Sequence, residues 1–180
     1  KIPLRGQGSG VVPSPGWLGR TDWQGYVPFN EMPSQFNPPA ALVVNANNRV
    51  IAKDASHFIT HNWAARYRAE RILQRLNGDG EISLETMQSV QNDTLSLMAK
   101  DLLPKLLELA SSNSDEDGPV IALLRKWNGV MARDRIAPLI FSTWVLELNK
   151  LIYGDELAEL TPSYLTLRPQ FLNAVLFSRP

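Results

Sequence analysis

The stretch that decides the fold is Trp17-Leu18-Gly19-Arg20-Thr21-Asp22-Trp23-Gln24-Gly25-Tyr26-Val27-Pro28-Phe29. Its glycines and prolines, with others spread over residues 1–60, exclude long helices, because proline lacks the backbone N–H and fixes φ. We therefore expect ordered loops and short extended pieces in this part of the chain. One clear strand is expected over residues 41–46, where Val43 and Val44 favour extended backbone.

Helical periodicity replaces this pattern after residue 60. Spacing and end signals predict helices over residues 63–76, from 84 to beyond 102, and over 119–128, 138–153 and 169–176. Asn62 and Ser83 are the expected N-caps, and Pro119 suits a first helical position. Pro104 is expected to kink or restart the second helix, and residues 111–118 are expected to form an acidic loop.

These patterns predict an α+β chain, a mostly helical fragment with a few strands. Residues 1–60 form the part made of loops and strands, and residues 61–180 form the helical part of one partial domain. A lone pair of strands is marginal in water. The partner strands are therefore expected in sequence outside this chain, within a larger protein.

The composition excludes several functional classes. The 180 residues include 18 Lys and Arg against 18 Asp and Glu, and this balanced charge argues against a nucleic-acid partner. The absence of cysteine removes disulfides, thiol nucleophiles and cysteine-based zinc sites. No apolar run reaches the roughly 18–20 residues that a membrane-spanning helix needs.

Two local motifs are weak candidates for binding sites. Gly6-Gln7-Gly8-Ser9-Gly10 has the look of a phosphate-binding loop, but no Lys-Ser/Thr pair and no helix follow it. His57 and His61 are four residues apart and could share a helix face as metal ligands, yet no carboxylate completes the set. We expect ordinary histidines at both positions instead.

An ordered set of motifs points to a known family. The set comprises the opening stretch, Glu31-Met32-Pro33, Asn37-Pro38-Pro39, Asn45-Ala46-Asn47-Asn48-Arg49, Trp63, Tyr67-Arg68-Ala69-Glu70-Arg71-Ile72, Leu124-x-x-Trp127-Asn128-Gly129, and Ala137-Pro138 before Trp144. In this order and spacing the motifs resemble the penicillin acylase (penicillin amidase) family of N-terminal-nucleophile hydrolases. The resemblance makes the chain an internal segment of the large β subunit.

The resemblance implies a hydrolase that cleaves carbon–nitrogen bonds in linear amides, as in antibiotic biosynthesis. Family members are made as one precursor that cleaves itself, and the new β N-terminus is a serine whose α-amine serves as its base. That serine lies upstream, so these 180 residues alone are expected to be inactive. The implied partners are the rest of the β subunit, the α subunit and a small N-acyl amide. The implied parent is a periplasmic or secreted protein folded as a four-layer αββα sandwich.

The resemblance also assigns roles to two residues. Asn47 matches the asparagine whose side-chain amide donates to the oxyanion, and Arg68 matches an arginine that supports the serine's amine and that asparagine. Without the resemblance, Asn47 reads as a turn residue and Arg68 as a solvated helix arginine. The resemblance raises Ca²⁺ for the intact enzyme, but His57 stands where a ligand aspartate is expected and imidazole suits Ca²⁺ poorly. Asp54 could substitute, and we assign no cofactor or metal to this segment.

Three alternatives stay open at this point. Arg66 and Arg71 compete with Arg68 for the supporting role because they lie close to it in sequence. The tryptophans could line an acyl pocket but are expected to be core anchors, namely Trp17, Trp23, Trp63, Trp127 and Trp144. The alternative function is a non-catalytic binding or helical interaction module that kept the scaffold.

Overall fold

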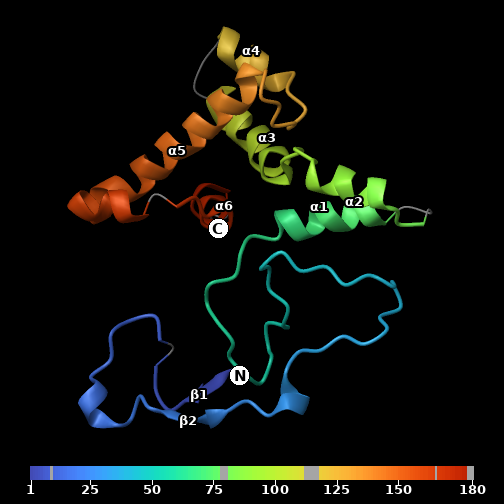
Figure 1. The fold of residues 1–180 in the computed structure, drawn as a ribbon. Helices are drawn as coiled ribbons and strands as arrows, with labels where there is room; N and C mark the ends of the chain where they lie inside the picture. Colours follow the sequence, from blue (N-terminus) through green and yellow to red (C-terminus); the bar gives the residue numbers. More distant parts are fainter. Residues whose placement is uncertain (9, 78–80, 112–117, 165, 178–180) are drawn as a thin grey trace. The chain divides into compact units, whose positions relative to one another are not determined.

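The protein divides into two compact units. The computed structural model describes residues 1–8, 10–77, 81–111, 118–164 and 166–177, and the units are Lys1–Arg66 and Tyr67–Pro180. Within the described residues, the two-stranded sheet belongs to the first unit and every α-helix to the second (Figure 1). The predicted α+β class, mostly helical with few strands, is confirmed.

The first unit contains an antiparallel pair of short strands, β1 (Pro3–Arg5) and β2 (Trp23–Tyr26). Pro3 pairs with Tyr26, and the register shifts just before Arg5. Two 3-10 helices interrupt the loops, η1 (Gly16–Leu18) and η2 (Phe29–Glu31). Gly19 ends η1 in the left-handed region, a conformation that favours glycine. The predicted loops with short extended pieces are confirmed here.

The predicted strand over residues 41–46 is wrong. The exposure of residues 41–48 alternates from one residue to the next, as in an extended chain. However, residues 42–45 make no ladder with any described segment, and one isolated parallel bridge joins Asn48 to Ala64. The β-branched side chains favour extended backbone, but a strand also requires a hydrogen-bonded neighbour.

The second unit consists, within its described residues, of helices. Its elements are α1 (Tyr67–Leu76), α2 (Leu84–Gln91), α3 (Leu97–Ser111), α4 (Pro119–Arg125), α5 (Ile136–Leu157), η3 (Ala158–Tyr164) and α6 (Pro169–Phe177). The core is drawn from α3, α4, α5 and α6, and the largest apolar side chains in it are at most 1% exposed: Leu102, Leu124, Phe141, Val145 and Leu172. No helix within the described ranges is both long and apolar enough to cross a bilayer.

Local end signals were reliable where a neighbouring residue supplies the cap. The Ser83 hydroxyl accepts the Thr86 N–H at 3.2 Å, so Ser83 is the N-cap of α2. Pro119 is the first residue of α4, and the short helix predicted from residue 169 is α6. Gly78, which with Asn77 is the expected stop signal of the first helix, and residues 112–117 of the predicted acidic loop lie outside the described residues.

The first two helix predictions were wrong in their boundaries because of contacts distant in sequence. The first helix starts at Tyr67 and not at residue 63, since the Ala64 N–H donates to the Asn47 carbonyl at 2.8 Å and keeps that segment extended. The second prediction spans two helices, since Leu95 forms an antiparallel bridge with Val130 between α2 and α3. Main-chain bonds beside this bridge, Ser96 N–H to Gly129 O and Met131 N–H to Thr94 O, are both 2.9 Å.

Three further boundaries differ from the prediction. The restart at Pro104 is wrong: α3 continues through it, because the buried leucines around it offset the roughly 3 kcal/mol that an internal proline costs. Helix α4 ends at Arg125, where the Trp127 indole N–H donates to the Val130 carbonyl at 2.9 Å and fixes a turn. Helix α5 continues beyond its expected end at residue 153, through Gly154 to Leu157. One glycine costs a helix only about 1 kcal/mol, and the Tyr153 ring stacks on the Phe171 ring with centroids 5.2 Å apart.

Candidate functional site

The segment around Asn47 is a tight turn held by its neighbouring asparagines. The Asn47 N–H donates to Asn45 Oδ1 at 2.8 Å, and the Ala46 N–H donates to Asn48 Oδ1 at 3.1 Å. Asn47 has φ of +62°, in the left-handed region that asparagine tolerates better than most residues. Two asparagine side chains therefore support the backbone, and the third, Asn47, is at the exposed apex.

The Asn47 turn is also tied to the end of the first unit. The Asn47 carbonyl accepts the Ala64 N–H at 2.8 Å, beside the bridge between Asn48 and Ala64. Ala46, directly before Asn47, is buried. A buried residue on one side and a main-chain bond on the other restrict the direction of the Asn47 side chain. Such restriction is what a preorganised hydrogen-bond donor requires.

Arg68 lies in the first turn of α1, and its side chain is exposed. The residues beside it on the helix face inward: the Tyr67 hydroxyl donates to Asp101 Oδ2 at 2.5 Å, and Arg71 binds Asp93. Asn47 belongs to the first unit and Arg68 to the second, so their proximity stays a prediction. The contact of Arg71 with Asp93 gives Arg71 a structural role, which favours Arg68 over Arg71 as the supporting arginine.

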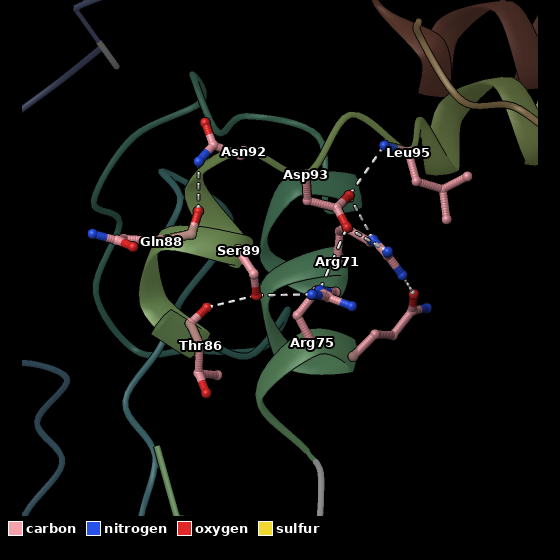
Figure 2. A network of polar contacts seen from close by, with 9 residues as sticks. Arg71, Arg75, Thr86, Gln88, Ser89, Asn92, Asp93 and Leu95 are labelled. Carbon is pink, nitrogen blue, oxygen red and sulfur yellow. Dashed lines mark hydrogen bonds and ion pairs between the residues drawn. The ribbon is translucent and has the colours of Figure 1, made fainter. Parts of the chain in front are cut away.

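Asp93 is the centre of a polar network between α1 and α2 (Figure 2). Arg71 donates to both carboxylate oxygens of Asp93, from Nε at 2.9 Å and from Nη2 at 2.5 Å, and the Leu95 N–H donates at 3.0 Å. Arg75 Nε lies 3.5 Å from Asp93, and Arg75 Nη2 donates to Ser89 Oγ at 2.9 Å. The hydrogen bond from Arg71 is the main cause that lowers the pKa of Asp93, against the opposing effect of burial.

A second carboxylate, Asp101 on α3, joins three helices. Besides the Tyr67 hydroxyl, it accepts Lys105 Nζ at 3.0 Å and Asn173 Nδ2 at 3.3 Å, so α1, α3 and α6 meet at this residue. The pKa of Asp101 is lowered, first by the hydrogen bond from Tyr67 and then by Lys105, with burial opposing both. The sequence reading missed Asp93 and Asp101. The break in helical periodicity at Asp93 was the one signal that could have found it.

The two histidines do not converge on a common site. His57 Nε2 lies 2.5 Å from Glu31 Oε2, on the wall of a hollow of about 300 Å³ that is also lined by Val27 and Ile59. His61 packs its ring against Phe58, with centroids 4.5 Å apart. Among the residues that the structure describes, no three His, Asp or Glu side chains gather closely enough to hold a metal ion.

A family profile described as penicillin amidase matches residues 1–177. The chain belongs to the penicillin amidase family. Penicillin acylase 2 proenzyme of Pseudomonas sp. (strain SE83) is 31% identical over 152 residues, 84% of this chain and 20% of that protein. Acyl-homoserine lactone acylase QuiP of Pseudomonas putida is 27% identical over 170 residues, 87% of this chain and 21% of that protein.

Penicillin G acylase of Escherichia coli is also similar, with 28% identity over 125 residues, 66% of this chain and 14% of that protein. The chain therefore spans about a fifth, or less, of the length of these relatives. The resemblance to the penicillin amidase family that the motifs predicted is confirmed over almost the whole chain.

The tryptophans of this penicillin amidase segment differ in burial. Trp127 and Trp144 pack against the core, and the Trp127 ring meets Phe141 with centroids 5.4 Å apart. Trp17 and Trp23 are 85% and 61% exposed, so the expectation of core anchors is wrong for these two. The first unit has, within its described residues, only a two-stranded sheet and two short 3-10 helices with which to cover them.

Proposed function

We propose that this chain is part of an acylase that hydrolyses linear amides by acyl transfer to an N-terminal serine outside these residues. Asn47 then donates its side-chain amide to the oxyanion of the tetrahedral intermediate. The observation that carries this proposal is the asparagine turn, which holds an exposed amide donor on a restrained left-handed backbone. Backbone strain of this kind collects at functional sites.

In the proposed reaction, the serine hydroxyl attacks the amide carbonyl and its proton passes to the serine's own α-amine. The carbonyl oxygen becomes an oxyanion, which the Asn47 Nδ2–H stabilises more strongly than the neutral carbonyl. Collapse of the intermediate expels the amine product, which takes the proton, and leaves an acyl ester on the serine. Water then hydrolyses the ester by the same route.

Arg68 supports this reaction electrostatically in the proposal. A guanidinium stays charged at any working pH, so it disfavours the protonated form of a nearby α-amine and lowers its pKa. The amine is then neutral, and able to accept the serine proton, at a lower pH than an ordinary α-amine, whose pKa is about 7.7–8.0.

We also propose a setting for the site, which rests on the resemblance to the family. The two-stranded sheet and the helices of this chain are a portion of the four-layer αββα sandwich, completed by the rest of the β subunit and by the α subunit of a self-cleaving precursor. We place the protein in the periplasm or outside the cell. The substrate is an N-acyl amide, the class common to the penicillin and acyl-homoserine lactone acylases among its relatives.

The test is to replace Asn47 by Asp in the full-length protein. Aspartate has nearly the same shape and tolerates a left-handed backbone, but it lacks the N–H donor. We expect kcat for a chromogenic N-acyl amide to fall roughly 10²–10³-fold. Asn47→Gly, which frees the backbone, should give a similar loss, because the cause is the missing donor.

Asn37 provides a matched control, because it is also an exposed asparagine of the first unit with positive φ, at +43°. Asn37→Asp should leave kcat within about twofold, as removing a donor outside the site changes no transition-state contact. Unchanged turnover in the Asn47→Asp enzyme would refute the oxyanion role.

A non-catalytic interaction module is the second candidate. It is favoured by a mostly apolar hollow of about 530 Å³ between α4 and α5, lined by residues such as Val120, Ile136 and Leu139. Exposed apolar surface of this kind is typical of contact surfaces. A full-length protein that carries a processed N-terminal serine and still hydrolyses no N-acyl amide would favour this candidate.

A further inference from the structure

We infer that Asp93 is a positioning residue for the proposed acyl transfer: it holds Arg71, fixes the rotation of α1 about its axis, and so sets where the Arg68 guanidinium lies. The inference rests on the proposed role of Arg68. It extends that role to a carboxylate that touches neither substrate nor nucleophile.

The contact between Arg71 and Asp93 has a defined geometry. Two N–H groups of one planar guanidinium bind the two oxygens of one carboxylate, which fixes orientation as well as distance (Figure 2). The Asp93 side chain is 13% exposed and that of Arg71 24% exposed, so water competes weakly for either partner. A two-point pair therefore restricts the roll of α1 more than a single-point ion pair would.

Asp93 is itself attached to a rigid segment. The Leu95 N–H donates to Asp93 Oδ1 at 3.0 Å. Main-chain hydrogen bonds of 2.9 Å then join this segment to residues 129–131: the Ser96 N–H donates to the Gly129 carbonyl, and the Thr94 carbonyl accepts the Met131 N–H. The Asp93 carboxylate is thus held by a hydrogen-bonded segment between α2 and α3. Arg71 can fix the position of α1 only if the carboxylate that it binds is itself fixed.

The position of Arg68 depends on the roll of α1. Arg68 and Arg71 are three residues apart, within one turn of a helix that has 3.6 residues per turn. A roll of about 20° moves a group at a side-chain radius of ~5–6 Å by ~2 Å. Misplacement by 1 Å can cost roughly 100-fold in rate, so this roll is large on the scale of catalysis.

A second tether determines what happens when Asp93 is removed. Tyr67 and Arg71 are four residues apart and share one face of α1, and the Tyr67 hydroxyl donates to Asp101. Loss of Asp93 leaves α1 held by the Tyr67 contact with Asp101 at its start and by the Arg75 contact with Ser89 near its end. The helix is expected to stay folded and to roll about these contacts, which changes Arg68 more than it changes stability.

The test compares Asp93→Asn, Arg68→Ala and the double variant in the full-length protein. Asp93→Asn keeps the shape but loses the charge and one of the two acceptors. We expect kcat to fall about 10-fold or more with KM within roughly twofold. The acid limb of the kcat/KM profile should move to higher pH, because the cation no longer lowers the pKa of the α-amine. Asp93→Glu should restore part of the activity.

Arg68→Ala tests whether Asp93 acts through Arg68 or only stabilises the fold. If Asp93 acts through Arg68, Asp93→Asn has no further effect on kcat or on the acid limb once Arg68 is alanine. As a matched control, Asp134→Asn changes a carboxylate that is 82% exposed and should leave both readouts unchanged. An Asp93→Asn enzyme that loses thermal stability but keeps its kcat and its acid limb would overturn the inference. If Arg68→Ala alone changes nothing, the proposed role of Arg68 fails, and the inference fails with it.

Discussion

A single substitution at Asp101 tests how much the polar contacts between helices stabilise the second unit. Its carboxylate receives donors from α1, α3 and α6, through Tyr67, Lys105 and Asn173. Replacing Asp101 by alanine removes the common acceptor of all three groups. We expect the second unit to lose about 2 kcal/mol of unfolding free energy.

The magnitude follows from the three contacts. The 2.5 Å bond from Tyr67 to a carboxylate that is 27% exposed contributes ~1.5 kcal/mol, the lower end for a bond to a charged group. The Lys105 pair contributes only ~0.4 kcal/mol because Lys105 is 38% exposed and regains water. The longer Asn173 bond contributes ~0.5 kcal/mol. The better helix propensity of alanine offsets about 0.5 kcal/mol.

Urea unfolding followed by far-UV circular dichroism measures the effect, since the α-helices among the described residues all belong to the second unit. Tyr67→Phe alone should cost ~1–1.5 kcal/mol, and this cost should vanish once Asp101 is alanine. Asp134→Ala, at an exposed ion pair of 4.0 Å, should stay within ~0.5 kcal/mol. A loss below ~0.5 kcal/mol for Asp101→Ala, or a Tyr67→Phe cost that survives in its background, would refute the reasoning.

Three further predictions use the same measurement. Phe141→Ala should cost ~3–5 kcal/mol of unfolding free energy, because Phe141 is fully buried against Trp127. Phe36→Ala, at a side chain that is 91% exposed, should cost under ~0.5 kcal/mol, and equal effects would contradict the described core. Gly129→Ala should cost ~1–2 kcal/mol, since Gly129 has φ of +86° and a Cβ would approach Lys100 Cγ to 3.0 Å, while Gly16→Ala, in open space, should be near neutral. The lowered pKa values of Asp93 and Asp101 mean that their stabilising effect is complete above the ordinary Asp pKa of about 3.9 and is lost as the pH falls through the lowered values. Stability should therefore drop below about pH 4, less steeply in Asp93→Asn and Asp101→Asn, and an unchanged slope in both would refute their assignment.

Signals carried by adjacent residues could be read from the sequence. Ser83, Pro119 and Pro169 each mark a helix start, because a cap or a preset φ acts within one turn. The family motifs could also be read, because they depend on residue types in order and not on folding.

Features that depend on distant segments could not be read. The delayed start of α1 comes from the bond between Ala64 and Asn47, and the break before α3 comes from the pairing of Leu95 with Val130. The role of Asp93 was hidden for the same reason, since its partner Arg71 lies on α1, 22 residues away in sequence. Local propensity contains no information about which partner a backbone or a carboxylate will find.

The uneven burial of the tryptophans allows their intrinsic fluorescence to report on the two units separately. Trp17 and Trp23 are open to solvent in the first unit, whereas Trp127 and Trp144 lie against the core of the second. Iodide should quench the emission of the first pair and spare that of the second, so one cuvette can follow the two units separately. Any partner that covers Trp17 and Trp23 should lower the quenchable fraction, which gives a binding assay that needs no label.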